Sequence, residues 1–189
     1  MPKKKIYALV GMAGSGKSEA INYLQKKYGW PKVYFGEITF EEMKKRKLEL
    51  NYDNEQATRE DLRKKFGMGA YAALSLPKIK NAMKLSKVVL IESLYSWSEY
   101  KIIKEKFKDD FKVISIHASP AMRFDRLKKR KGWRPMKDYK TFKQRDWTEI
   151  ENIEKGGPIA VADYVIINEG TKKELEKALE NIVKKEKIR

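Results

Sequence analysis

An α/β fold with a parallel sheet is the class that the sequence predicts, and three observations support it. Five short apolar runs recur along the 189 residues. Each run is apolar at successive positions, as expected for strands that are buried on both faces. Stretches with helical spacing separate the runs. This alternation indicates right-handed crossovers and a sheet covered by helices on both sides.

The predicted strands are, in chain order, Ile6 to Val10, Lys32 to Phe35, Lys87 to Ile91, Lys112 to His117 and Asp163 to Ile167. The clearest helix follows the last of them. Its residues Leu175, Leu179 and Ile182 fall on one face after Thr171, a residue type that favours the N-cap. In such sheets ligands bind beyond the carboxyl ends of the strands, where we therefore expect the functional residues.

Two segments depart from the simple alternation. The span 36–86 has no strand pattern and predicts inserted helices, with Pro77 at a kink or a helix start. The span 128–143 has little apolar periodicity and many Lys and Arg residues. We expect both to be mobile parts of one domain, 1–189, since this length suits a single domain with a sizeable core.

Composition restricts the function classes. Lys and Arg number 43 against 26 Asp and Glu, a net charge of +17, while 41% of residues are hydrophobic. This favours a folded protein with a basic surface and an anionic partner: nucleotide, nucleic acid or acidic membrane. The absence of cysteine excludes thiol chemistry, and one histidine excludes a His-rich metal centre. No apolar run approaches the roughly 20 residues that cross a bilayer, so we expect a soluble, cytoplasmic protein.

A phosphate-binding motif follows the first predicted strand. Residues 11–18, GMAGSGKS, match G-x-x-x-x-G-K-[ST] between a strand and a helical pattern. Backbone N–H groups of such a loop surround the phosphates, Lys17 reaches the outer phosphates, and Ser18 coordinates Mg2+. We predict ATP and Mg2+ as cofactors, with the nucleotide held by Gly11, Ala13, Gly14, Ser15, Gly16, Lys17 and Ser18. The motif leaves open whether the γ-phosphate goes to water, to a small acceptor or into mechanical work.

Two carboxylates end neighbouring strand patterns. Glu92 follows four apolar residues and is predicted to hold the metal, the alternative being a surface glutamate at a strand end. Glu37 follows the second strand and is predicted to act in catalysis by orienting or deprotonating an acceptor hydroxyl. Its alternative is an acidic residue that complements the dipole at a helix start.

A basic segment follows the fourth strand. Residues 121–147 contain eleven Lys and Arg against three Asp, nearly half of the net charge. Arginines that close over phosphates stabilise the charge of phosphoryl transfer, so Arg126 and Arg130 are predicted as catalytic and Arg145 as nucleotide-binding. Arg134 continues the four-residue spacing. The alternative is a solvated basic helix.

With these residues the chain resembles the P-loop nucleotide kinase superfamily, and more narrowly dephospho-CoA kinases and related archaeal and bacterial nucleotide-kinase-like (adenylate-kinase-related) proteins. The resemblance lies in residues 11–18, 35–37 with Arg46, 91–92, 116–120 leading into 123–127, 145–146 with Glu149, and 162–171. It implies a P-loop kinase fold with strand order 2-3-1-4-5, a helical acceptor-binding region at 36–86 and an arginine-rich lid at 128–145. It also places Asn168 and Gly170 beside the adenine. Such kinases commonly have Asp where this chain has Glu37 and Glu92.

The resemblance implies a phosphotransferase that moves the γ-phosphate of ATP to dephospho-CoA or a nucleoside monophosphate. An adenylate-kinase-like ATPase acting in RNA or ribosome assembly is the alternative, which the charge and four Trp support. A module that binds ATP without turnover is a third, motivated by the two Glu substitutions. We expect ATP and a small acceptor as partners, with RNA less favoured, no membrane, and a monomer or small homo-oligomer.

Overall fold

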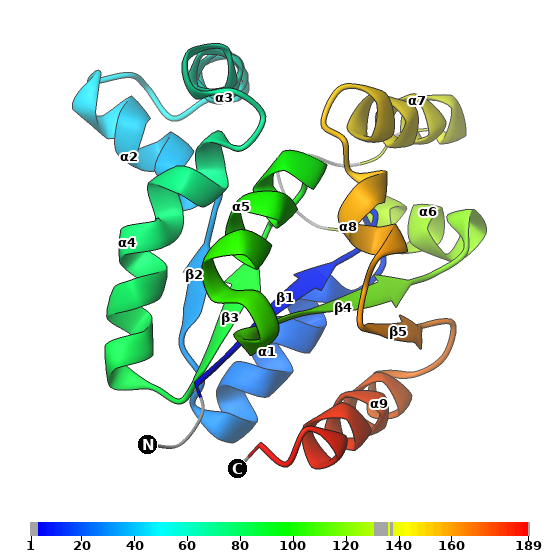
Figure 1. Ribbon diagram of the computed structural model, residues 1–189. Helices are drawn as coiled ribbons and strands as arrows, with labels where there is room; N and C mark the ends of the chain where they lie inside the picture. The colour runs from blue at the N-terminus through cyan, green and yellow to red at the C-terminus, as the bar shows by residue number, and fades with distance from the viewer. Residues whose placement is uncertain (1–3, 131–135, 137, 189) are drawn as a thin grey trace.

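A five-stranded parallel sheet forms the centre of the computed structural model, which describes residues 4–130, 136 and 138–188 (Figure 1). Its strands are β1 (Lys5–Val10), β2 (Lys32–Tyr34), β3 (Val88–Glu92), β4 (Phe111–His117) and β5 (Tyr164–Ile167). Each lies within one residue of its predicted bounds. The order β2-β3-β1-β4-β5 confirms the topology that the resemblance implied.

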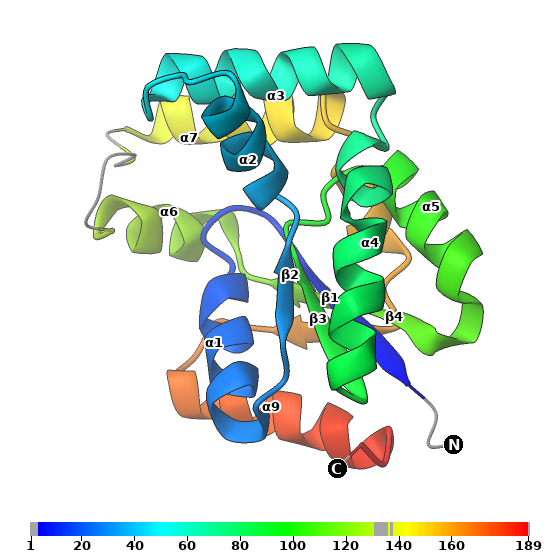
Figure 2. The same cartoon turned by 90° about the vertical axis from the view of Figure 1, so that its left-hand side faces the viewer.

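Helices cover both faces of the sheet, as predicted (Figure 2). They are α1 (Lys17–Tyr28), α2 (Glu37–Lys45), α3 (Tyr52–Phe66), α4 (Ala70–Leu85), α5 (Trp97–Phe107), α6 (Pro120–Lys128), α7 (Tyr139–Glu151), α8 (Gly156–Ala160) and α9 (Lys172–Lys185), with a 3-10 turn η1 (Lys108–Asp110). One core layer packs α1 and α9 against Tyr7 and Leu9 of β1. The other packs α4 and α5 against Ile6 and Ala8, because successive strand side chains point to opposite faces.

The last helix follows its sequence pattern closely. Thr171 caps α9 in a capping box with Glu174, which satisfies the first free N–H groups of the helix. Leu175, Leu179 and Ile182 are buried in the core layer that α9 shares with α1. The predicted N-cap and apolar face are thus confirmed.

The region 36–86 is helical, as predicted, and contains α2, α3 and α4. Pro77 lies inside α4 rather than at a helix start. In Figure 1, α3 and α7 stand on opposite sides of the carboxyl end of the sheet. Within the described ranges, no helix is both long and apolar enough to cross a membrane.

Sheet register determines which residues meet at the site. In the parallel ladder Leu9 of β1 is level with Glu92 of β3, and Val10 is level with Ser115 of β4. The loop that leaves β1 therefore begins beside the carboxylate that ends β3.

Candidate active site

Backbone conformation and close packing require glycine in the phosphate-binding loop, residues 11–18, as Gly14 and Gly16 show. Gly14 has φ +82°, and a Cβ atom there would lie 2.6 Å from the carbonyl oxygen of Arg123. Gly16 has φ +105°, and its Cβ would lie 2.3 Å from Asn168 Nδ2. Both conformations are left-handed and both spaces are closed, so only glycine fits. The loop is thus packed between the start of α6 and the residue after β5.

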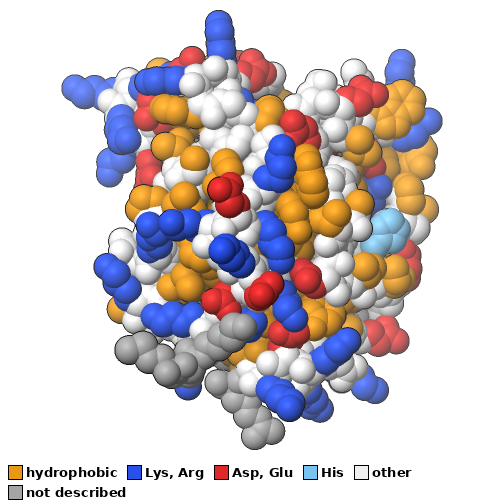
Figure 3. All heavy atoms as spheres, in the orientation of Figure 1, with side chains coloured by type: hydrophobic (Ala, Val, Ile, Leu, Met, Phe, Trp, Pro, Cys, Tyr) orange, Lys and Arg blue, Asp and Glu red, His pale blue; other side chains and the backbone are white. Residues whose placement is uncertain are grey.

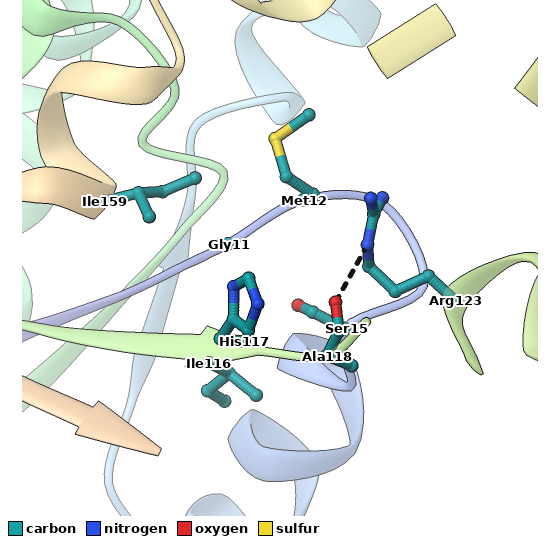
Figure 4. A pocket seen from close by; sticks show the side chains of 8 residues that line it. All are labelled: Gly11, Met12, Ser15, Ile116, His117, Ala118, Arg123 and Ile159. Carbon is teal, nitrogen blue, oxygen red and sulfur yellow. Dashed lines mark hydrogen bonds between the residues drawn. The ribbon is translucent and has the colours of Figure 1, made fainter. Parts of the chain in front are cut away.

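Asn168 and Arg123 support the loop through its carbonyl groups. Asn168 Nδ2 donates to the Ser15 carbonyl at 2.8 Å. Arg123 Nη1 donates to the Ala13 carbonyl at 3.2 Å, and its Nε donates to the Ala118 carbonyl at 3.1 Å (Figure 4). Because the Ser15 and Ala13 carbonyls accept these hydrogen bonds, the residue after β5 and helix α6 hold the loop in place.

A buried ion pair fixes Arg123 in this position. Its guanidinium donates to both carboxylate oxygens of Asp146, at 3.0 and 2.6 Å, and the side chains are 6% and 14% exposed. Bidentate geometry of this kind is strong and directional. Arg123 therefore belongs to the framework of the loop, and α7, which carries Asp146, is tied to the loop through it.

A cleft of about 720 Å³ opens in front of the loop. It brings together most of the predicted site residues: Ala13, Gly14, Gly16, Lys17, Ser18, Glu92, Arg126, Arg130, Arg145, Asn168 and Gly170. Gly11 and Ser15 line instead a small cavity behind the loop (Figure 4). The cleft is thus formed by the loop after β1 and the start of α1, by β2 and the end of β3, by α6 and α7, and by the segment from the end of β5 into α9.

Lys17 lies at the start of α1 and points back along the loop. Its Nζ donates to the Met12 carbonyl at 2.9 Å. Burial, together with the nearby Lys155 and Arg145, lowers the pKa of Lys17 from 10.5 to about 7 against the opposite effect of Glu149. A polyanion bound next to Lys17 would stabilise its charged form, and the ammonium group would in turn attract the polyanion.

Ser18 and Glu92 line the cleft and bring a hydroxyl oxygen and a carboxylate oxygen close together. Ser18 Oγ donates to Glu92 Oε1 at 3.4 Å, and Glu92 Oε2 accepts from Lys32 Nζ at 2.7 Å. A hydroxyl and one carboxylate suit Mg2+, which takes the rest of its ligands from substrate phosphates and water. Among the described residues no group of three or more acidic or His side chains could hold a metal by itself.

A buried lysine, Lys155, also faces the cleft, and no motif in the sequence indicated it. Lys155, 3% exposed, precedes α8 and pairs with Glu149 of α7, and its Nζ lies 4.4 Å from the centre of the Tyr95 ring. Arg145 Nε donates to the same glutamate at 3.0 Å. Burial lowers the pKa of Lys155, while Lys155 and Arg145 hold the pKa of Glu149 low despite its burial.

Arg126 is the arginine whose environment most favours an anion. It lines the cleft, and its Nη1 atom is buried without a hydrogen-bond partner among the residues that the structure describes. Buried donors without a partner are rare, so a phosphate oxygen is a fitting ligand. Arg130 is exposed at the rim of the cleft. Arg134 and much of the expected lid (131–135 and 137) lie outside the described residues.

Glu37 does not line the cleft. It lies in the first turn of α2, exposed, and its carboxylate pairs with Lys78 Nζ of α4 at 2.8 Å. This position corresponds to the alternative of an acidic residue at a helix start. A role on an acceptor hydroxyl would require the Lys78 ion pair to open.

Comparisons with known proteins agree with this architecture. A family model described as an AAA domain matches residues 10–143. Among solved structures, a shikimate kinase from Bacteroides thetaiotaomicron superposes with a TM-score of 0.61 at 14% identity, over 97% of this chain and 99% of its own. A gluconokinase from Sinorhizobium meliloti gives 0.55 at 14% identity, over 98% and 96%. The chain therefore has a P-loop kinase fold.

Sequence relatives cover nearly the whole chain. A UPF0200 protein of Thermococcus onnurineus (strain NA1) is 34% identical over 95% of this chain and 97% of its own length. A UPF0200 protein of Methanococcus maripaludis (strain C7) is 37% identical over 95% and 98%. The phosphate-binding loop, the kinase-type sheet and these relatives together show that the chain belongs to the UPF0200 family of the kinase-like P-loop superfamily.

Proposed function

We propose that the protein is a Mg2+- and ATP-dependent kinase that transfers the γ-phosphate to a nucleotide-like small molecule. One observation carries the proposal. Lys17, Arg126, Arg145 and Lys155 come from four different segments and converge on the cleft that also contains the Ser18–Glu92 pair. Phosphoryl transfer requires such positioned cations around the transferred group far more than it requires covalent help from the protein.

Each group has a task in this reaction. Backbone N–H groups of the loop and Lys17 would bind the β- and γ-phosphates, while Ser18 and Glu92 would hold the metal. Mg2+ supplies charge neutralisation between the phosphates. Arg126, Arg130 and Arg145 would stabilise the charge on the equatorial oxygens. The acceptor oxygen forms the new bond to phosphorus, the bond to the bridging oxygen of ADP breaks, and the hydroxyl proton leaves to solvent or an acceptor-side base.

The charge of the cleft favours an acceptor that is itself anionic. Seven Lys and Arg line it against two Glu among the described residues: Lys17, Lys32, Arg126, Arg130, Arg145, Lys155 and Lys172 against Glu19 and Glu92. This surplus suits two anionic substrates better than one nucleotide. Dephospho-CoA and nucleoside monophosphates both carry the phosphate that such a site would bind. Asn168 and Gly170, at the edge of the cleft, would then border the adenine of ATP.

An acceptor panel tests the proposal. The protein with Mg2+ and ATP is given dephospho-CoA, AMP, CMP, dTMP, shikimate, gluconate or no acceptor, and ADP and phosphorylated product are measured together. We expect ADP to form in step with one phosphorylated acceptor. ADP release that needs no acceptor would contradict the small-molecule kinase.

A distributed basic surface supports the second candidate, an RNA-directed ATPase. Lys and Arg side chains spread over the face shown in Figure 3, with acidic side chains between them, rather than gathering only at the cleft. In that case RNA would stimulate ADP release, and its affinity would fall steeply with salt concentration. RNA binding without such stimulation would argue against this candidate.

Nucleotide binding is expected to take up a proton near pH 8. The pKa of Lys17 is about 7, so at pH 8 roughly nine-tenths of Lys17 is neutral. A bound triphosphate raises that pKa and Lys17 becomes protonated. Calorimetry in buffers of different ionisation enthalpy should show nearly one proton taken up, less at pH 6, and none from this group in Lys17→Met. Equal uptake in the variant would contradict the assignment.

A further inference from the structure

Lys32 contacts the carboxylate that the proposed metal site uses. Its Nζ lies 2.7 Å from Glu92 Oε2, while Glu92 Oε1 faces Ser18 Oγ at 3.4 Å. The side chains of Lys32 and Glu92 are 30% and 16% exposed, and both line the cleft. The Glu92 carboxylate thus pairs with the Lys32 ammonium group and is also the proposed ligand of the metal.

The contact follows from the order of the strands. β2 lies beside β3, with Lys32 level with Leu90 and Tyr34 level with Glu92. Lys32 and Tyr34 are two residues apart, so their side chains point to the same face of the sheet, and both line the cleft. The long lysine side chain spans the two-residue offset along the ladder and reaches Glu92. No rearrangement of backbone is needed for the ion pair to open, because the ammonium group is at the end of a flexible chain.

We propose that Lys32 competes with the divalent cation for Glu92 and so weakens the binding of the metal at this carboxylate. This rests on the proposed function, which assigns Ser18 and Glu92 to the metal. An ammonium group on Oε2 lowers the negative charge that a metal would meet, and the metal must open the ion pair. A Mg2+ ion without nucleotide would gain only two protein ligands, Ser18 Oγ and the Glu92 carboxylate, for opening this ion pair. A metal bound to ATP also keeps its phosphate ligands, and the released Lys32 can then face the anionic substrates.

The competition can be measured without turnover. Calorimetry gives the dissociation constant of a non-hydrolysable ATP analogue in excess Mg2+ and in EDTA. The ratio of the EDTA value to the Mg2+ value reports how much more tightly the protein–nucleotide complex binds the metal than free nucleotide does. In Lys32→Met the competitor is gone, and we expect this ratio to rise about fivefold, as for a partly exposed ion pair near 1 kcal/mol. Lys32→Gln, which also lacks the charge, should give the same result if the methionine variant folds poorly.

Lys172→Met is the matched control. Lys172 lines the same cleft but pairs with Glu19 at 3.1 Å and is 73% exposed, so its loss removes an equal charge without touching Glu92. We expect its ratio to stay within about twofold of the original, since exposed charges are well screened. An unchanged or lower ratio in both Lys32 variants would overturn the inference, a lower one showing that Lys32 orients Glu92 for the metal.

Glu92→Gln separates this inference from the proposed function. It should reduce the ratio strongly, and Lys32→Met should have no added effect in that background, because the shared carboxylate is gone. If Glu92→Gln left the ratio unchanged, the metal assignment itself would fail. If Glu92→Gln reduced the ratio and the Lys32 variants did not raise it, only the competition would fail.

Discussion

Replacing Lys17 by methionine is expected to lower the rate of phosphoryl transfer by about a hundred- to a thousandfold, the usual cost of losing one preorganised group that stabilises developing charge. Lys17 is half-buried at the end of the phosphate-binding loop, near Lys155, Arg145 and Arg123. Methionine keeps the length and the apolar stem of lysine and removes the charge. The measurement is acceptor-dependent ADP formation at saturating ATP, compared with Lys26→Met on the exposed side of α1.

Loss of activity in this variant should not reflect loss of folding. The folded pKa of Lys17, about 7, lies below its unfolded value of 10.5, so the unfolded chain binds the proton more tightly between these values. This group therefore opposes folding most below pH 7, and its cost fades as pH rises toward 10.5. Lys17→Met should be at least as stable as the original at pH 6, measured by urea denaturation. Acceptor-dependent activity that survived the substitution would show that the site is misassigned.

The strands and the phosphate-binding loop could be predicted from the sequence because local residue patterns encode them. Buried parallel strands are apolar at consecutive positions, so all five could be located, and the phosphate-binding loop follows from glycine geometry within eight residues. Strand ends were informative for Glu92, because β3 is a central strand whose last residue meets the loop from β1. The same rule did not place Glu37 at the cleft, because the edge strand β2 ends at Tyr34 and α2 has already begun at Glu37.

Other site residues depend on tertiary contacts that no spacing rule encodes. Lys155 faces the cleft because its ammonium group pairs with Glu149 and lies over the ring of Tyr95. These two residues come from α7 and from the segment after β3. Lys32 reaches the site only through strand order. A lysine with a buried partner and a lysine on the surface look alike in a chain with 43 Lys and Arg. Charge counting could therefore find the basic segment at 121–147 but could not show which cations face the cleft.

The largest loss of stability is expected from breaking the Arg123–Asp146 pair. Asp146→Asn preserves shape but leaves the buried Arg123 guanidinium without its counter-charge, which should lower the free energy of unfolding by about 3 kcal/mol. The control is Asp125→Asn on α6, whose exposed pair with Lys129 at 2.7 Å should contribute about 0.5 kcal/mol or less. Urea denaturation of the three proteins at pH 7 gives both values.

The same variant should also weaken nucleotide binding, because Arg123 holds the Ala13 carbonyl from behind the loop. Replacing both partners, Arg123→Met with Asp146→Leu, removes the buried charge altogether and should recover most of the stability. It should not recover nucleotide affinity, since methionine donates no hydrogen bond to Ala13. If the double variant regained both stability and nucleotide affinity, the pair would stabilise the loop by packing alone. If Asp146→Asn were as stable as the control Asp125→Asn, the Arg123–Asp146 pair would be solvated rather than buried.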